Sequence, residues 1–182
     1  MLPLVRERHI PWPWRNGPTY SARMSEEQSG PLLRVGPESD AALALNFHHL
    51  VRAFPEEPGD PMRDFVVTAR GPGVAVEVGV RTWGGDGLDD FLAQLAESFR
   101  GWSGVREWCS LERDLTVSAE HTGARVELTW ALRAPLPDHE WCFEATTGHA
   151  PGEDMRNLAA EMHAFLTAEP WARAGRDEVL PD

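Results

Sequence analysis

The stretch that decides the fold is residues 87–132, GLDDFLAQLAESFRGWSGVREWCSLERDLTVSAEHTGARVELTWAL. Its first part has the apolar spacing of a helix that buries one face. From residue 105 onward, apolar and polar residues alternate as they do in half-buried strands. One change of period, from helix to strand, indicates an α+β domain. The apolar positions of the predicted helix are Leu88, Phe91, Leu92, Leu95 and Phe99.

The regions on either side extend this pattern. Four strands are predicted before the helix, and the clearest runs from Val74 to Val80, where valine occupies every second position. Four strands and a closing helix, with an apolar stripe from Met155 to Leu166, are predicted after it. The predicted order is β-β-β-β-α-β-β-β-β-α. Runs of strands joined by short turns favour a single antiparallel β-sheet with two helices packed on one face.

The chain divides into three predicted parts. Residues 1–29 contain Pro-Trp-Pro-Trp and read as an irregular extension, because proline cannot continue a helix or a central strand. Residues 30–169 form the single α+β domain, and residues 170–182 form an acidic tail. Met24 is a candidate alternative start, which leaves residues 1–23 as an extension or as a Trp-bearing arm that docks on a partner.

Charge excludes one class of partner and favours another. The formal net charge is −12, and each of the 17 basic residues is arginine. An acidic body repels phosphate backbones, so nucleic-acid binding is not expected. It favours a protein partner with a basic surface. No stretch of 18 apolar residues or secretory signal is found, so we expect a cytoplasmic protein that does not span a membrane.

Cysteines and histidines give no metal motif. Cys109 and Cys142 fall in predicted strands without CxxC spacing, and we expect two buried thiols rather than a disulfide or redox pair. His48 and His49 are expected on opposite faces of one strand, where they would not share a metal ion. We therefore expect neither a metal nor a cofactor.

Carboxylates are the strongest catalytic candidates. Glu112 and Asp114 lie two residues apart at a strand end, and paired carboxylates can perform acid–base chemistry when their pKa values differ. The simpler interpretation is a solvated acidic loop. The glycine-rich turn 84–87 precedes a helix, but its aspartates would repel phosphate, so it reads as a helix entry with Asp86 as the N-cap. No residue is assigned a catalytic role.

Tryptophan supplies the binding candidate. Trp108 alternates with Arg106 and Ser110, which predicts an exposed sheet face, and both Trp and Arg are enriched at interface anchors. The predicted binding residues are Trp108, Arg106, Glu112 and Asp114.

The runs Phe91–Trp102, Leu111–Leu115, Val126–Arg133 and Gly152–Ala159 resemble the uncharacterised bacterial family catalogued as domain of unknown function 6228, over residues 30 to 167. This resemblance implies no activity. The spacing of Phe91, Leu95, Gly104 and Glu112 is also similar to that of WapI-family immunity proteins, a likeness of order and spacing only.

The sequence therefore predicts a non-catalytic protein-binding domain, for which an immunity-type role is one form. Two alternatives stay open. The first is a hydrolase-like enzyme that uses Glu112 and Asp114 with a loop histidine, and the second is a self-assembling structural module. The oligomeric state is not predicted.

Overall fold

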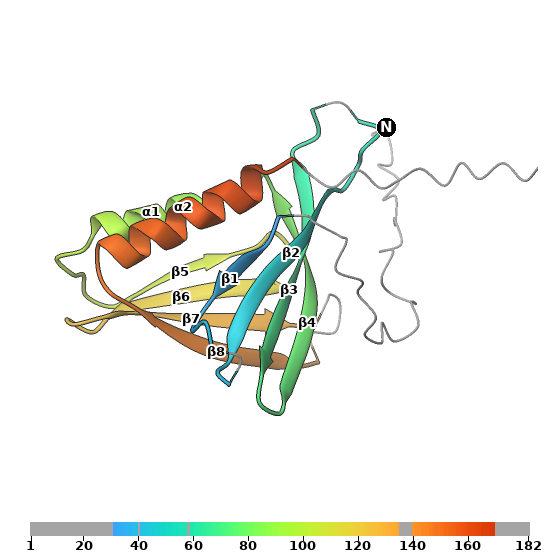
Figure 1. Cartoon of the computed structure of the whole chain (residues 1–182). Coiled ribbons are helices and arrows are strands. Elements are labelled where there is room, and N and C mark those ends of the chain that lie inside the picture. Colours follow the sequence, from blue (N-terminus) through green and yellow to red (C-terminus); the bar gives the residue numbers. More distant parts are fainter. Residues whose placement is uncertain (1–30, 40, 58, 135–139, 170–182) are drawn as a thin grey trace, which may run out of the picture.

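The computed structural model describes residues 31–39, 41–57, 59–134 and 140–169 (Figure 1). Eight strands and two helices follow one another in the predicted order. The elements are β1 (Leu33–Val35), β2 (Ala44–Arg52), β3 (Met62–Gly71), β4 (Val74–Trp83), α1 (Leu88–Glu97), β5 (Val105–Cys109), β6 (Leu115–His121), β7 (Val126–Arg133), β8 (Cys142–His149) and α2 (Glu153–Thr167).

The strands form two antiparallel sheets, and the prediction of a single sheet is wrong. One sheet has the order β1-β2-β3-β4 and the other has the order β5-β6-β7-β8. Figure 1 shows the strands of the first sheet running steeply across those of the second. Each sheet is a meander of neighbouring strands, and each is followed in sequence by one helix. The α+β class is confirmed.

Two helices are too few to cover the apolar face of a single eight-stranded sheet, which explains why the strands form two sheets. Eight strands side by side span about 38 Å, at roughly 4.8 Å a strand. Two helices, each about 10 Å across, would cover only about half of that apolar face. The structure instead turns the apolar face of each sheet toward a shared core, to which both helices contribute. The chain leaves the first sheet at the turn 84–87, where Gly84, Gly85 and Gly87 all have positive φ.

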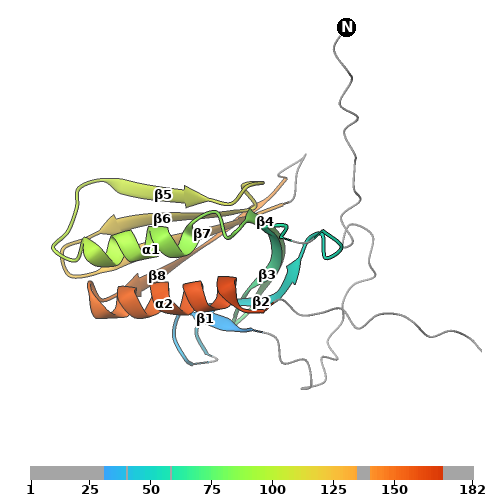
Figure 2. The ribbon, with the colours of Figure 1, turned by 90° about the horizontal axis from the view of Figure 1, so that it is seen from above.

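The helices close the remaining side of the core. They pack against each other, with α1 beside β5 and α2 beside β1, so each covers an edge strand of one sheet (Figure 2). His163 of α2 and Asp89 of α1 join them through a 2.7 Å contact. The predicted apolar stripe of α2 is confirmed, because Met155, Leu158, Ala159, Met162, Phe165 and Leu166 are all buried.

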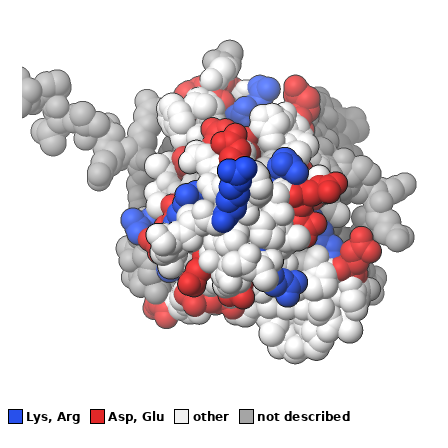
Figure 3. All heavy atoms as spheres, turned by 90° about the vertical axis from the view of Figure 1, so that its left-hand side faces the viewer, with Lys and Arg blue, Asp and Glu red and all other residues white. Residues whose placement is uncertain are grey.

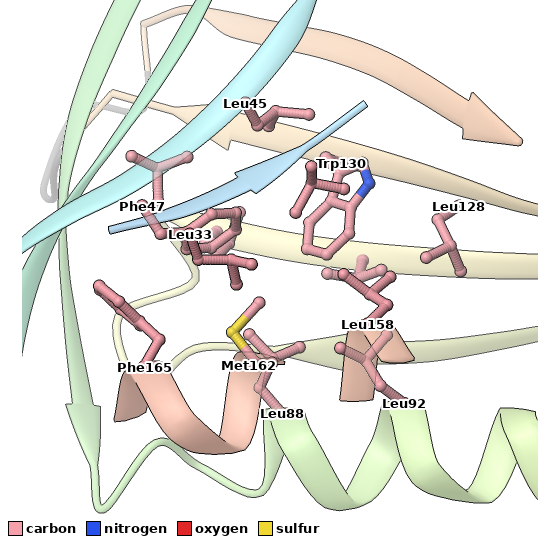
Figure 4. Packing of buried hydrophobic residues seen from close by; sticks show 14 of the residues in the cluster. Leu33, Leu45, Phe47, Leu88, Leu92, Leu128, Trp130, Leu158, Met162 and Phe165 are labelled. Atoms are coloured by element: carbon pink, nitrogen blue, oxygen red, sulfur yellow. The ribbon is translucent and has the colours of Figure 1, made fainter. Parts of the chain in front are cut away.

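Aromatic rings connect the three parts of the core. Phe47 of β2 lies 5.7 Å from Trp130 of β7 and 6.1 Å from Phe165 of α2, in edge-to-face geometry in both cases. Figure 4 shows these side chains pointing toward one another, with Leu88 and Met162 beneath them. The indole N–H of Trp130 donates to the hydroxyl of Thr147 at 3.0 Å, so the buried ring has no unpaired polar atom.

Strand β2 departs from strict alternation. Its pairing with β3 shifts between His48 and Val51, and His49 has a φ of 55°. This bulge turns Leu50 into the core, where regular alternation would have placed His49 and Val51.

Some predictions concern residues beyond the described part. The extension 1–29, with the candidate start Met24, and the tail 170–182 lie outside it. Within the described ranges, no helix combines the length and apolar character needed to cross a membrane.

We predict that Trp130→Ala lowers the free energy of unfolding by about 3–5 kcal/mol, because it removes a fully buried ring that contacts both Phe47 and the hydroxyl of Thr147. Trp141→Ala is the matched control, since Trp141 is 42% exposed and its loss should cost under about 0.5 kcal/mol. Urea unfolding monitored by circular dichroism measures both. Equal losses would contradict the placement of the core.

Candidate functional site

Charged side chains meet where the first sheet touches the turn between β5 and β6. Arg81 of β4 forms a bidentate pair with Asp64 of β3, at 2.9 and 3.0 Å, and its guanidinium also lies 3.9 Å from Glu112. Asp114 follows in the same turn. We call Asp64, Arg81, Glu112 and Asp114 the junction cluster. The junction cluster joins the first sheet to the β5–β6 turn of the second by an electrostatic contact, in addition to the aromatic packing of the core.

Asp114 is the buried member of the junction cluster, with 3% of its surface exposed. Burial raises the pKa of its carboxyl group to about 6, and the charge of Glu112 acts in the same direction. Hydrogen bonds from the hydroxyl of Ser110 and the amide of Leu115 oppose this rise. In the part of the chain that the structure describes, no histidine is a hydrogen-bond partner of Asp114.

Asp86 organises the neighbouring turn, and it does so differently from the predicted N-cap. Gly87 occupies the N-cap position of α1 without a side-chain cap. The carboxylate of Asp86 instead accepts hydrogen bonds from the amides of Trp83, at 3.0 Å, and Leu111, at 2.8 Å. Its carbonyl oxygen accepts the indole N–H of Trp108 at 2.8 Å. Asp86 therefore joins the end of β4 to the end of β5 and the turn that follows it, a segment more than 20 residues away in the sequence.

Two large apolar side chains project from this tie. Trp83 is 61% exposed and Leu111 is 54% exposed. Their amides share one carboxylate, so the two residues lie side by side at the end of β4 and in the β5–β6 turn. We call Trp83 and Leu111 the apolar rim. Asp86 holds it with a φ of 50°, a conformation that costs free energy in a residue other than glycine.

A groove of about 640 Å³ lies along the outer face of the second sheet. Strand register explains most of its lining, because residues that alternate with the buried ones face outward on all four strands, while Trp108 and Val117 border the groove although their side chains face the core. The lining is polar and carries both signs of charge. It comprises Glu107, Trp108, Cys109, Arg113, Thr116, Val117, Ser118, Thr129, Ala131, Arg133, Cys142 and Glu144. We call this the outer groove.

The predicted exposed face around Trp108 is wrong in its geometry. Trp108 pairs in register with Val117, whose side chain is fully buried, so the indole ring packs against the core. Arg106 lies on the same side, 4.7 Å above the ring of Trp102, and donates to the hydroxyl of Ser98 at 3.0 Å. The structure therefore brings Glu112 and Asp114 together around Arg81, and places Arg106 and Trp108 toward α1. A binding role for these four residues stays a prediction.

Both cysteines and one histidine pair also differ from expectation. Cys109 and Cys142 are free and exposed, not buried.

The bulge in β2 brings the Nδ1 atoms of His48 and His49 to 2.5 Å, so the two rings do not point to opposite faces. Burial and the charge of His49 lower the pKa of His48. Within the described residues, no group of three or more potential ligands is placed to hold a metal ion.

Charge is mixed on the surface that can be followed in Figure 3. Acidic and basic side chains are interspersed on this face, which lies at the left of Figure 1. The net charge of −12 is thus not concentrated there into one acidic patch.

The apolar rim was missed by the sequence interpretation, although a signal for it was present. In β4 the valines at even positions face inward, so the odd positions, including Arg81 and Trp83, face outward. Extending the clearest strand pattern in the chain by two residues would therefore have indicated an exposed Trp83. Leu111 carries no such signal, because its position depends on the long-range contact with Asp86.

Comparison with protein families gives one match. The model of a family of unknown function, DUF6228, matches residues 38–169, well over half of the chain. This bears out the resemblance noted in the sequence, while the likeness to WapI immunity proteins stays a prediction. No curated protein matches the chain.

We predict that Asp114→Asn changes the pH dependence of stability. A carboxyl group whose pKa is raised from 3.8 to about 6 stabilises the fold fully below 3.8, and this contribution is lost as pH rises through 6. Between pH 4.5 and 7.5 the wild-type protein should therefore lose about 2 kcal/mol relative to the variant, which does not titrate at this position. Urea unfolding at both values measures this. A difference between the two proteins that is independent of pH would contradict the assignment.

Proposed function

The chain belongs to the DUF6228 family, whose function is unknown, and we propose that it is a non-catalytic domain that binds a protein partner. The contact surface is the apolar rim of Trp83 and Leu111. The observation that carries the proposal is the tie at Asp86, which fixes two exposed apolar side chains at the junction of the two sheets.

The apolar rim has the properties of an interface anchor. Tryptophan is usually well buried, so a ring that is 61% exposed at the end of a regular strand calls for an explanation. Tryptophan dominates the binding energy of many interfaces when it enters a pocket on the partner. Because Asp86 fixes the backbone on both sides of the rim, little conformational entropy would be lost on binding.

Charge around the apolar rim specifies the chemistry of the partner. The turn that holds Leu111 also contains Glu112, Arg113 and Asp114, and it is joined to Asp86 by a hydrogen bond and to Arg81 and its partner Asp64 by charge, which makes four carboxylates and two guanidinium groups. At neutral pH this neighbourhood is therefore negative overall. A matching partner carries an apolar pocket with basic residues at its edge. Neutralisation of a basic toxin, the role that the WapI likeness implies, is one form of this function.

An enzyme is the second candidate, and Asp114 is the observation in its favour. Its raised pKa is typical of catalytic carboxyl groups. Asp114 is not part of the lining of the outer groove, however, and no histidine belongs to that lining either. The carboxyl group is instead surrounded by hydrogen bonds that stabilise the β5–β6 turn. This arrangement favours a structural role for it.

We predict that a photo-crosslinking amino acid at position 83 captures a protein partner in the producing cells, and that the same amino acid at position 105 does not. Val105 is the control because it is 58% exposed on β5, away from the Asp86 tie. With the captured protein purified, Trp83→Ser should weaken the complex by at least about 30-fold in calorimetry, since loss of a buried anchor costs about 2 kcal/mol or more. Val105→Ser should leave the affinity unchanged.

Two outcomes would overturn this proposal. Crosslinks from position 83 to a second copy of the chain would show a self-assembling module instead. Equal loss of affinity for the variants at positions 83 and 105 would show that the apolar rim is not the anchor. Thermal melting of both variants must match the wild type, and because both side chains are exposed, we expect that it does.

A further inference from the structure

Strand β8 is the edge strand that the fold leaves open. Helix α1 packs beside the edge strand β5 and helix α2 beside the edge strand β1, while β4 contacts β7 and meets the β5–β6 turn through Arg81 and Glu112. Among the described elements, β8 packs mainly against β7, and it borders the second sheet on the side opposite β5 (Figure 1). An open edge is a template on which another strand can pair.

The hydrogen-bond pattern identifies the backbone groups of β8 that face the open side. The amide of Ala134 donates to the carbonyl of Trp141 at 3.0 Å, and β7 and β8 continue from there as antiparallel strands without a register shift. In such a pair every second residue bonds to the neighbouring strand, and the residues between them point their N–H and C=O groups away from it. The residues that point away are Cys142, Glu144, Thr146 and Gly148. Among the described residues, none accepts a hydrogen bond from these four amides.

Strand β8 lacks most of the features by which natural edge strands avoid pairing. Such features include a proline, a lysine, a bulge and a very short length. The strand has eight residues, CFEATTGH, with neither proline nor lysine among them. Its one carboxylate belongs to Glu144, which is exposed. Because like charges directly opposite each other destabilise a strand pair, Glu144 restricts the registers in which another strand can bind.

We propose that β8 pairs antiparallel with β8 of a second copy of the chain, with Ala145 at the two-fold axis. In this register Glu144 lies opposite the partner's Thr146, and Cys142 lies opposite the partner's Gly148. All four residues with open backbone groups are then paired, by up to about eight hydrogen bonds. A register centred on Glu144 would place two carboxylates opposite each other, and one centred on Thr146 would leave Cys142 without a partner residue in the strand.

A second copy fits this edge because the pairing is self-complementary. The exposed residues of both copies share one face, and the buried Ala145 and Thr147 share the other, so two four-stranded sheets become one continuous sheet. The contact is separate from the apolar rim, which lies at the end of β4 and in the β5–β6 turn. Each dimer would therefore carry two apolar rims, and crosslinks from position 83 report on the rim and not on β8.

The charge of the chain predicts how the dimer responds to salt. Each copy has a net charge of −12, so two copies repel each other, whereas the proposed strand pair contains no ion pair. Salt screens the repulsion and leaves the backbone hydrogen bonds in place. Sedimentation velocity over a dilution series of the wild-type protein should show a monomer–dimer equilibrium that shifts toward dimer as salt is added. A monomer at every concentration and salt would overturn the proposal and leave the open edge to a different partner.

Charge variants at Thr146 test the register. Thr146→Lys faces the partner's Glu144 twice in the symmetric dimer and should strengthen the dimer about fivefold, whereas Thr146→Glu should weaken it by a similar factor. Gln94→Lys is the matched control, because it makes the same change of charge at an exposed position of α1, the helix beside β5. It should change the dissociation constant by less than about twofold. Equal effects of the two lysine variants would overturn the register.

A proline variant tests the role of the backbone. Thr146→Pro removes an amide at the centre of the open edge, and Thr146→Ala retains it, while both lose the 2.9 Å contact with the hydroxyl of Thr129. Proline is tolerated where an edge amide points away from the sheet, so circular dichroism should be unchanged. The proline variant should dimerise at least about tenfold more weakly than the alanine variant. Equal dimerisation of the two would overturn the proposal, and the charge variants decide it if proline disturbs the strand.

Discussion

The contact between Phe47 and Trp130 is the interaction on which the rest of the structure depends. Neither sheet can bury its apolar face alone, and these two rings are where the first sheet meets the second. Phe165 completes the contact from α2, so each of the two sheets and a helix contributes one ring. The chain builds this core from two successive units, each a four-stranded meander followed by a helix. The ring contact requires the sheets to face each other, and that geometry fixes the line along which they meet.

The proposed protein-binding surface lies where the two sheets meet, and its position follows from the way they pack. Where β4 ends and α1 begins, the turn between β5 and β6 comes close enough for Asp86 to hold both segments. Arg81 and Glu112 approach across the same junction. Three hydrogen bonds to Asp86 compensate for the free energy cost of its positive φ. They hold Trp83 and Leu111 outside the core, where the two side chains form the apolar rim. The outer groove has a different origin, since it is the solvent face of the second sheet alone.

Local sequence patterns predicted the helices and strands, whereas long-range contacts determined which side chains are exposed. The change of period within residues 87–132, with the patterns on either side of it, indicated the correct order of helices and strands, because each element repeats its own spacing. It could not distinguish one sheet from two, since that depends on whether β4 and β5 share hydrogen bonds across α1. Trp108 was placed on the wrong face because its neighbours were considered without its partner Val117. The exposure of Cys109 follows from the same pairing of β5 with β6. The position of His49 follows from a bulge in β2 that the local sequence pattern does not predict.

The central claim is that the two sheets share one core and therefore unfold together. Native-state hydrogen exchange measured by NMR on wild-type protein and Phe47→Ala tests it most directly. The account predicts that the slowest amides of β3 and of β7 exchange with the same free energy of opening, and that the substitution lowers both by the same amount. If only the amides of β1–β4 lost protection while those of β7 kept theirs, the sheets would be independent units, and the junction could not be the rigid base of a binding surface.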